Sequence, residues 1–296
     1  EIWPGEGTFF GLGVNIKFPS DFTKAPYSIV ATAVKTLPQK VSFPFSLINT
    51  SAETVPGLSP AYNEIVPGWV LSDNIYAVKR NEGKFRKRNK ARRSVFDFEV
   101  FRPDIMDLVI KAREALESVT ADEKEAEAPK NDEKKGIKEF YTDQDIPGLG
   151  KNYLKEESRL RAINTYSFYL KNYALAGLKR ELSLRIDAGA DTSLKALLEG
   201  DAESPRWEHE RGVLTGEGLG SDFVRDLEEY VRIQEEISGS IQASKEKDDA
   251  RGARIIADYP SAHPPASEDG FVVQTWKEFE VLEKEVAAII SALKNA

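Results

Sequence analysis

The first part of the chain alternates short apolar runs with proline and glycine. Phe10, Ile16 and Phe22 recur every six residues, and apolar residues at such a period are typical of a β-helix, whose short strands stack coil upon coil. Seven prolines between residues 19 and 67 exclude long helices there, because proline lacks the amide donor. We therefore predict two or three β-helix coils and an extended segment over residues 1–76. An irregular β-sandwich edge or a wrapping segment is the alternative.

Three later stretches carry apolar residues at helical spacing, and each predicts an amphipathic helix. They are residues 151–186, 221–245 (opening on the potential caps Ser221 and Asp222) and 275–293. In the first, Leu160 belongs to the apolar stripe, whereas Arg159 and Glu181 are expected in solvent. A shorter helix is predicted within residues 96–119, where Pro103 suits the first turn. The second half is thus predicted to be a helical layer or bundle.

The stretch 120–138 contains almost no large apolar side chain, so it cannot bury enough surface to offset its ordering entropy. The predicted fold class is α+β, with C-terminal coils of a left-handed β-helix followed by an α-helical domain. The predicted segments are the β-helix end and extended segment (1–76), a basic stretch with a short helix (77–119), a charged linker (120–138) and the helical domain (139–296).

Composition narrows the class of protein. The chain has no cysteine, which excludes disulfides, thiolate metal sites and a cysteine nucleophile. A hydrophobic fraction of 41% with 30% charged residues describes a soluble folded protein, and no apolar run is long enough to span a bilayer. We expect a cytoplasmic bacterial protein with no membrane partner, no metal and no cofactor. Because the chain begins at Glu1 in mid-pattern, we also expect it to be the C-terminal part of a longer protein.

One basic segment stands out in a chain whose net charge is -8. Nine Lys or Arg residues lie between Lys79 and Arg93, against the single acidic Glu82. They could bind phosphate, a sugar nucleotide, RNA or an acidic partner, since arginine forks fit phosphate and carboxylate. Alternatively, they pair with the 49 acidic residues of the chain. The candidate anion-binding residues are Arg80, Lys84, Arg86, Arg88, Lys90, Arg92 and Arg93. Nucleic acid is disfavoured, because Phe85 alone would stack on bases.

The remaining candidate sites are each expected to be structural. His209 lies among Glu208 and Glu210 and could act as a base or a metal ligand, but we expect a surface turn after Pro205. The glycines of 216–220 have neither a strand before them nor Lys-Ser/Thr after them, which excludes dinucleotide-binding and Walker motifs, so a loop is expected. The aromatic group could line a sugar-binding face, but helical spacing favours core packing. Its members are Tyr153, Tyr166, Phe168, Tyr169 and Tyr173.

Three stretches carry a resemblance to a known group: residues 14–48, 90–103 and 152–166. The chain resembles an uncharacterised bacterial family with a left-handed β-helix of hexapeptide repeats and a helical C-terminal region. The run Ala25–Ala31 (Ala-Pro-Tyr-Ser-Ile-Val-Ala) is similar to the one that closes such stacks. The resemblance implies a trimeric superfamily, many of whose members transfer acyl or nucleotidyl groups to sugars. Its acyltransferases carry a catalytic histidine within a coil, whereas the two histidines here are His209 and His263.

We therefore expect a structural and oligomerisation module, forming homotrimers, that binds an anion such as a sugar phosphate or sugar nucleotide. The alternative is part of a hexapeptide-repeat-type transferase acting on sugars or sugar nucleotides, whose catalytic residues precede this chain. We assign no catalytic residue within this chain.

Overall fold

The computed structural model describes residues 1–119, 139–202 and 204–295. The predicted linker 120–138 lies outside the described residues. Strands and helices are both present, which confirms the α+β class. By its internal contacts the chain divides into two compact units, a division that cuts the predicted helical segment 139–296 after Ser167. The first unit comprises Glu1–Ser72 and Asp104–Ser167, and the second comprises Asp73–Pro103 and Phe168–Ala296.

Short parallel strands build the start of the first unit. They fall into three sets: β1 (Ile2–Trp3), β4 (Ser20–Asp21) and β7 (Gln39–Lys40); β2 (Phe9–Phe10), β5 (Ile29–Val30) and β8 (Leu47–Thr50); and β3 (Asn15–Ile16) with β6 (Lys35–Thr36). Ile2 is opposite Ser20, and Phe9 is opposite Ile29. The chain therefore returns to each set after about 18–20 residues, as repeated coils would. The left-handed β-helix goes beyond these pairings and stays a prediction.

One corner of this strand region is formed by residues in the left-handed backbone conformation. Gly7, Tyr27 and Phe45 have φ values of 63°, 57° and 56°. The Tyr27 and Phe45 rings stack with centroids 5.3 Å apart, which offsets part of the backbone strain. A Cβ on Gly7 would lie 2.3 Å from Cδ1 of Tyr27. The first member of this stack must therefore be glycine.

The parallel strands end one step later than the run Ala25–Ala31 suggested. β8 continues the set beyond β5, and β9 (Asn63–Val66) then pairs antiparallel to β8. β11 (Asn152–Lys155) adds to β9, and β10 (Phe140–Tyr141) adds to β11. The short helix α1 (Trp69–Asp73) follows β9, and α3 (Pro103–Glu117) begins at its proline as predicted. Phe22, Val30 and Ile48 lie fully buried in the core of this unit.

The long predicted helix is confirmed as α5 (Glu156–Asp187), but three of its side chains differ from prediction. Leu160 is 49% exposed, whereas Arg159 and Glu181 are buried. Arg159 is satisfied by hydrogen bonds to Glu156 and to the carbonyl of Leu116, so its burial carries no unpaired charge. Glu181 accepts a hydrogen bond from Arg185. The tyrosines Tyr153, Tyr166, Tyr169 and Tyr173 are buried, as core packing predicts.

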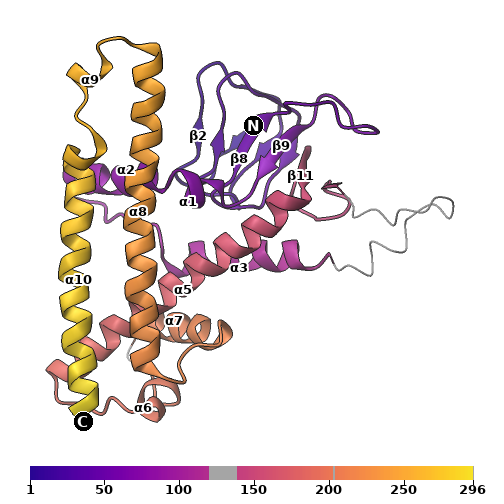
Figure 1. Cartoon of the computed structure of the whole chain (residues 1–296). Coiled ribbons are helices and arrows are strands. Elements are labelled where there is room, and N and C mark those ends of the chain that lie inside the picture. The colour runs from indigo at the N-terminus through magenta and orange to yellow at the C-terminus, as the bar shows by residue number, and fades with distance from the viewer. Residues whose placement is uncertain (120–138, 203, 296) are drawn as a thin grey trace, which may run out of the picture. The chain divides into compact units, whose positions relative to one another are not determined.

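Helices make up the second unit. They are α2 (Ile75–Arg88), the later part of α5, α6 (Leu194–Leu198), α7 (Pro205–Gly216), α8 (Phe223–Ile255), α9 (Tyr259–Ala262), η1 (Ala266–Glu268) and α10 (Gly270–Asn295). Figure 1 shows α8 and α10 side by side, and Trp276 Nε1 donates to Gln242 Oε1 across this pair at 2.9 Å. The helices predicted at 221–245 and 275–293 are confirmed, and both are longer than predicted. Asp222 caps α8.

The prediction of a surface turn after Pro205 is wrong. Ser204 accepts a hydrogen bond from the Trp207 amide, and proline occupies the first turn of α7. Both are standard signals for the start of a helix. Within the described ranges, no helix combines the length and apolar character needed to cross a membrane.

Candidate functional site

The basic segment begins on a helix that is anchored at one end. In the first turns of α2, Ile75, Tyr76 and Val78 are buried, and the Tyr76 ring meets Phe271 edge-on at 5.5 Å. α2 also packs against α8. The side chains of its last turns are mostly exposed. The basic end of α2 therefore extends beyond the part of the helix that is packed.

Three cations follow one face of α2. Arg80, Lys84 and Arg88 are spaced by four residues, which makes them neighbours on a helix surface. No carboxylate of the described residues forms an ion pair with any of the three, whereas Arg86 contacts Glu82 at 4.0 Å. Loss of hydration, followed by the charges of Arg80 and Arg88, lowers the pKa of the Lys84 ammonium. The row is therefore a cluster of like charges without compensation from described residues.

The remaining basic candidates lie in the stretch after α2. Lys90, Arg92 and Arg93 are exposed. Asn89 ends the helix, with its amide donating to the carbonyl of Phe85 and its side chain accepting from Ala91. The structure thus keeps all seven candidates in one continuous segment, four of them on α2 and three beyond it.

Aromatic rings support the basic end of α2. Phe85 packs against Phe98 with centroids 5.0 Å apart and against Phe96 at 6.3 Å. The Arg86 guanidinium lies 5.3 Å from the centre of the Phe98 ring. Phe85 and Phe96 are 44% and 51% exposed. Sequence reasoning counted Phe85 alone; the two phenylalanines just past the basic run were the signal available for a larger aromatic cluster.

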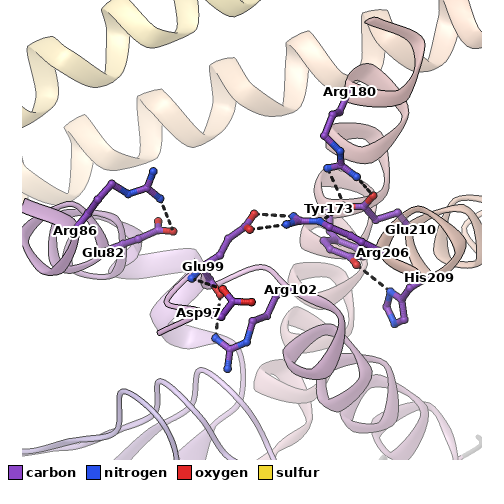
Figure 2. Close-up of polar contacts among 10 residues, drawn as sticks. All are labelled: Glu82, Arg86, Asp97, Glu99, Arg102, Tyr173, Arg180, Arg206, His209 and Glu210. Atoms are coloured by element: carbon purple, nitrogen blue, oxygen red, sulfur yellow. Dashed lines mark hydrogen bonds and ion pairs between the residues drawn. The ribbon is translucent and has the colours of Figure 1, made fainter. Parts of the chain in front are cut away.

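A four-residue ion network holds the segment that follows these rings. Glu99 accepts two hydrogen bonds from Arg206, at 2.6 and 2.7 Å, and Arg206 also donates to Glu210 at 2.9 Å. Arg180 of α5 completes the network by donating to the same Glu210 carboxylate. Figure 2 shows the four side chains joined in this order. The network ties the chain after the basic segment to α7 and α5.

The network contains two arginines and two carboxylates, so its charges balance. The contacts between them shift the pKa values of Glu99 and Arg206. Hydrogen bonds from Arg206 hold the pKa of the Glu99 carboxyl below its ordinary value of 4.5. The same bond, from the other side, raises the pKa of Arg206. Glu210 is fully buried, and two arginines compensate its charge, as a buried carboxylate requires. Both carboxylates are engaged by arginine, which suits a structural role.

His209 lies next to this network. Its Nδ1 is 3.0 Å from the hydroxyl of Tyr173. Burial, followed by the charge of Glu210, raises the pKa of that hydroxyl, so Tyr173 stays protonated at neutral pH and can donate to the ring nitrogen. In the part of the chain that the structure describes, no group of three or more His, Asp or Glu side chains could hold a metal ion.

The glycine run 216–220 forms the connection between α7 and α8, as predicted. Its last amide, that of Gly220, donates to the buried carboxylate of Asp226 at 2.7 Å. Desolvation raises the pKa of Asp226. This side chain therefore occupies an amide that a bound phosphate would otherwise use.

Comparisons with known proteins leave the family open. No model of a known protein family matches the chain, and no solved structure matches it. An uncharacterised protein of Treponema pallidum (strain Nichols) is 32% identical over 123 residues. The match covers 40% of this chain and 16% of that protein. No activity is assigned to that protein.

Proposed function

We propose that this chain is a structural and oligomerisation module whose basic segment binds a phosphate-bearing anion, either inorganic phosphate or a sugar phosphate. The observation that carries the proposal is the row Arg80, Lys84 and Arg88, which has no carboxylate partner among the described residues. A bound phosphate would offset the repulsion from Arg80 and Arg88, which adds to the loss of hydration in lowering the pKa of Lys84. It would also offer acceptors to two arginine forks.

Neither internal ion pairs nor the helix dipole accounts for the whole basic row. Pairing with acidic residues of the chain involves only Arg86 among the seven candidates, if the described residues alone are considered. Compensation of the helix dipole stabilises cations in the last turn by about 0.3–1 kcal/mol each. That effect covers Arg88, but Arg80 and Lys84 lie too far from the end of α2. A bound anion would compensate the charges of all three cations in the row.

In the first test, pyrophosphate is titrated into the protein at low salt and the heat of binding is measured by calorimetry. The variant Lys84→Gln/Arg88→Gln removes two cations of the row. Its matched control, Lys247→Gln/Lys277→Gln, removes two exposed cations elsewhere. Because hydrogen bonds to charged groups contribute about 1.5–3 kcal/mol each, we expect the first variant to weaken binding more than tenfold. Equal affinity in the two variants would refute the anion site.

A second measurement addresses the class of ligand. Bound anion should raise the pKa of Lys84 toward its ordinary value, which NMR of the labelled ammonium group can follow. A single-stranded RNA oligonucleotide serves as the competing probe. If RNA binds at least a hundredfold more tightly than pyrophosphate and the variant Phe96→Ala removes that difference, the partner is nucleic acid and the small-anion proposal is wrong.

We propose further that the parallel strand sets are coils of a left-handed β-helix that forms trimers. The return of the chain after 18–20 residues supports coils, and so does the stack of left-handed corners at Gly7, Tyr27 and Phe45. Trp3 and Phe9 are each 59% exposed on β1 and β2, and a trimer would cover such apolar surface. Light scattering should give a trimer mass, which Trp3→Ser/Phe9→Ser should lower; a monomer at every concentration would contradict the proposal.

A further inference from the structure

A cavity in the first unit is separate from the basic segment. Its volume is 610 Å³, within the range of small-molecule sites. It lies between the ends of β3 and β6, the segment 50–63, and Tyr153 of β11. All of its walls belong to the first unit. Nothing in the proposed function uses it.

Two lysines stand together on one wall of this cavity. Lys35 lies on β6 opposite Asn15 of β3, and Lys17 follows two residues after Asn15. The amide of Lys17 donates to the carbonyl of Thr36 at 3.2 Å, so Lys17, just past the end of β3, lies beside β6. Neither ammonium pairs with a carboxylate of the described residues. This wall therefore presents two uncompensated positive charges to a ligand.

The acidic side chain on the cavity wall is already paired. Glu53 contacts the Lys155 ammonium at 2.6 Å, and Glu64 lies 3.6 Å from the same ammonium. One ammonium faces two carboxylates here, so this end of the cavity keeps a net charge of -1. The positive charge of Lys17 and Lys35 remains for an anionic group.

Hydroxyl groups share the rest of the cavity wall with apolar side chains such as Leu37, Val55 and Leu58. Tyr153 is 1% exposed, and its hydroxyl lies 2.8 Å from Ser51 Oγ and 3.3 Å from Glu64 Oε2. Burial raises the pKa of this tyrosine, which keeps it protonated. Thr36 is also 1% exposed, and its Oγ1 has no hydrogen-bond partner among the described residues. Thr36 follows Lys35 on β6, so its side chain points to the opposite, buried face of the strand and not into the cavity.

We propose that this cavity binds a monosaccharide that carries a phosphate or carboxylate group. Lys17 and Lys35 receive the anionic group, while Ser51 and Tyr153 hydrogen-bond to the sugar hydroxyls. The two sets of groups converge on one small cavity, and together they match a ligand that is both anionic and polyhydroxylated. A purely apolar ligand would leave the two lysine charges uncompensated.

The test uses glucose 1-phosphate, glucuronate, glucose and inorganic phosphate as probes, with binding measured by calorimetry and NMR. The protein carries Lys84→Gln/Arg88→Gln throughout, so that loss of the proposed α2 site cannot be confused with loss of this one. In that background, Lys17→Gln/Lys35→Gln should weaken the binding of glucose 1-phosphate or glucuronate more than tenfold. The charge-matched control Lys24→Gln/Lys111→Gln should leave it unchanged.

Ser51 supplies the second arm. Ser51→Ala removes a hydroxyl from the cavity wall, so affinity for the sugar anion should fall severalfold; Ser51→Thr, which keeps a hydroxyl, should retain affinity. Comparing the affinities for glucose 1-phosphate and glucuronate shows whether the site prefers a phosphate or a carboxylate group. The proposal is overturned if neither sugar anion binds at millimolar concentration. It is also overturned if inorganic phosphate binds as tightly as glucose 1-phosphate, because the sugar hydroxyls would then add nothing.

Discussion

Gly177 lies in α5 directly against the buried carboxylate of Glu210. A Cβ at this position would lie 2.5 Å from Glu210 Oε2 and 2.6 Å from its Cδ. In an open helix interior, replacing glycine by alanine stabilises by about 1 kcal/mol. At Gly177 the added methyl group must instead displace the carboxylate that Arg180 and Arg206 share. We therefore predict that Gly177→Ala destabilises the second unit.

The magnitude follows from three contributions. Helix propensity favours alanine by about 1 kcal/mol. Overpacking costs about 1–3 kcal/mol, and one lost hydrogen bond between arginine and the Glu210 carboxylate costs about 1.5–3 kcal/mol. Together these give a net destabilisation of roughly 1.5–5 kcal/mol. At about 2–4 °C per kcal/mol, the melting temperature should fall by several degrees or more.

The assay is urea unfolding followed by circular dichroism and tryptophan fluorescence, since Trp207 is buried beside the network in α7. The matched control is Gly239→Ala in α8, where a Cβ would have no atom within 4 Å. That control should raise the free energy of unfolding by about 0.5–1 kcal/mol. In the background Glu210→Ala the carboxylate is gone but a Cβ remains 2.8 Å away, so Gly177→Ala should be less destabilising there than in the parent protein. If Gly177→Ala stabilises the parent protein as much as Gly239→Ala does, the close packing of Gly177 against Glu210 is wrong.

Two further predictions concern the ends of the network and of α8. Because the folded-state pKa of Glu99 is lowered, its bond to Arg206 stabilises the protein above pH 4.5 and the contribution disappears as the pH falls through the folded-state pKa. Unfolding of Glu99→Gln against the parent should show a stability deficit at pH 7 that shrinks in acid; a constant deficit would refute the assignment. Asp222 accepts hydrogen bonds from the amides of Val224 and Arg225, so Asp222→Ala should cost about 1 kcal/mol in urea unfolding, whereas Asp222→Asn should cost much less.

Local patterns in the sequence predicted the four longest of the described helices, whereas α2 and the shorter helices were not predicted. Apolar spacing identified α5, α8 and α10, while Pro103 and Asp222 marked where α3 and α8 begin. α7 was missed because the residues after Pro205 were expected to form a surface turn, although Ser204 and Pro205 are both helix-start signals. The short strands were predicted as a class, but their partners were not, because strand pairing depends on residues about 18–20 positions apart.

The candidate sites also differ in whether local sequence patterns could predict them. The basic segment was visible in the sequence, since a run of like charges is a local property. The network behind it was not, because Glu99 and Arg206 are 107 residues apart in the chain. The cavity in the first unit was likewise missed: Tyr153 lies 102 residues from Ser51, with which its hydroxyl interacts. No local pattern marks such a site.

The sequence by itself determined the α+β class, the positions of the long helices and the location of the positive charge. These follow from spacing, capping and composition, which act over a few residues. Tertiary structure alone decided which charges are compensated. It buried Arg159 and Glu210 with partners, and left Arg80, Lys84 and Arg88 without a carboxylate among the described residues. The physical reason is that an ion pair or a cavity forms only where folding brings distant side chains within a few ångströms and excludes water from them.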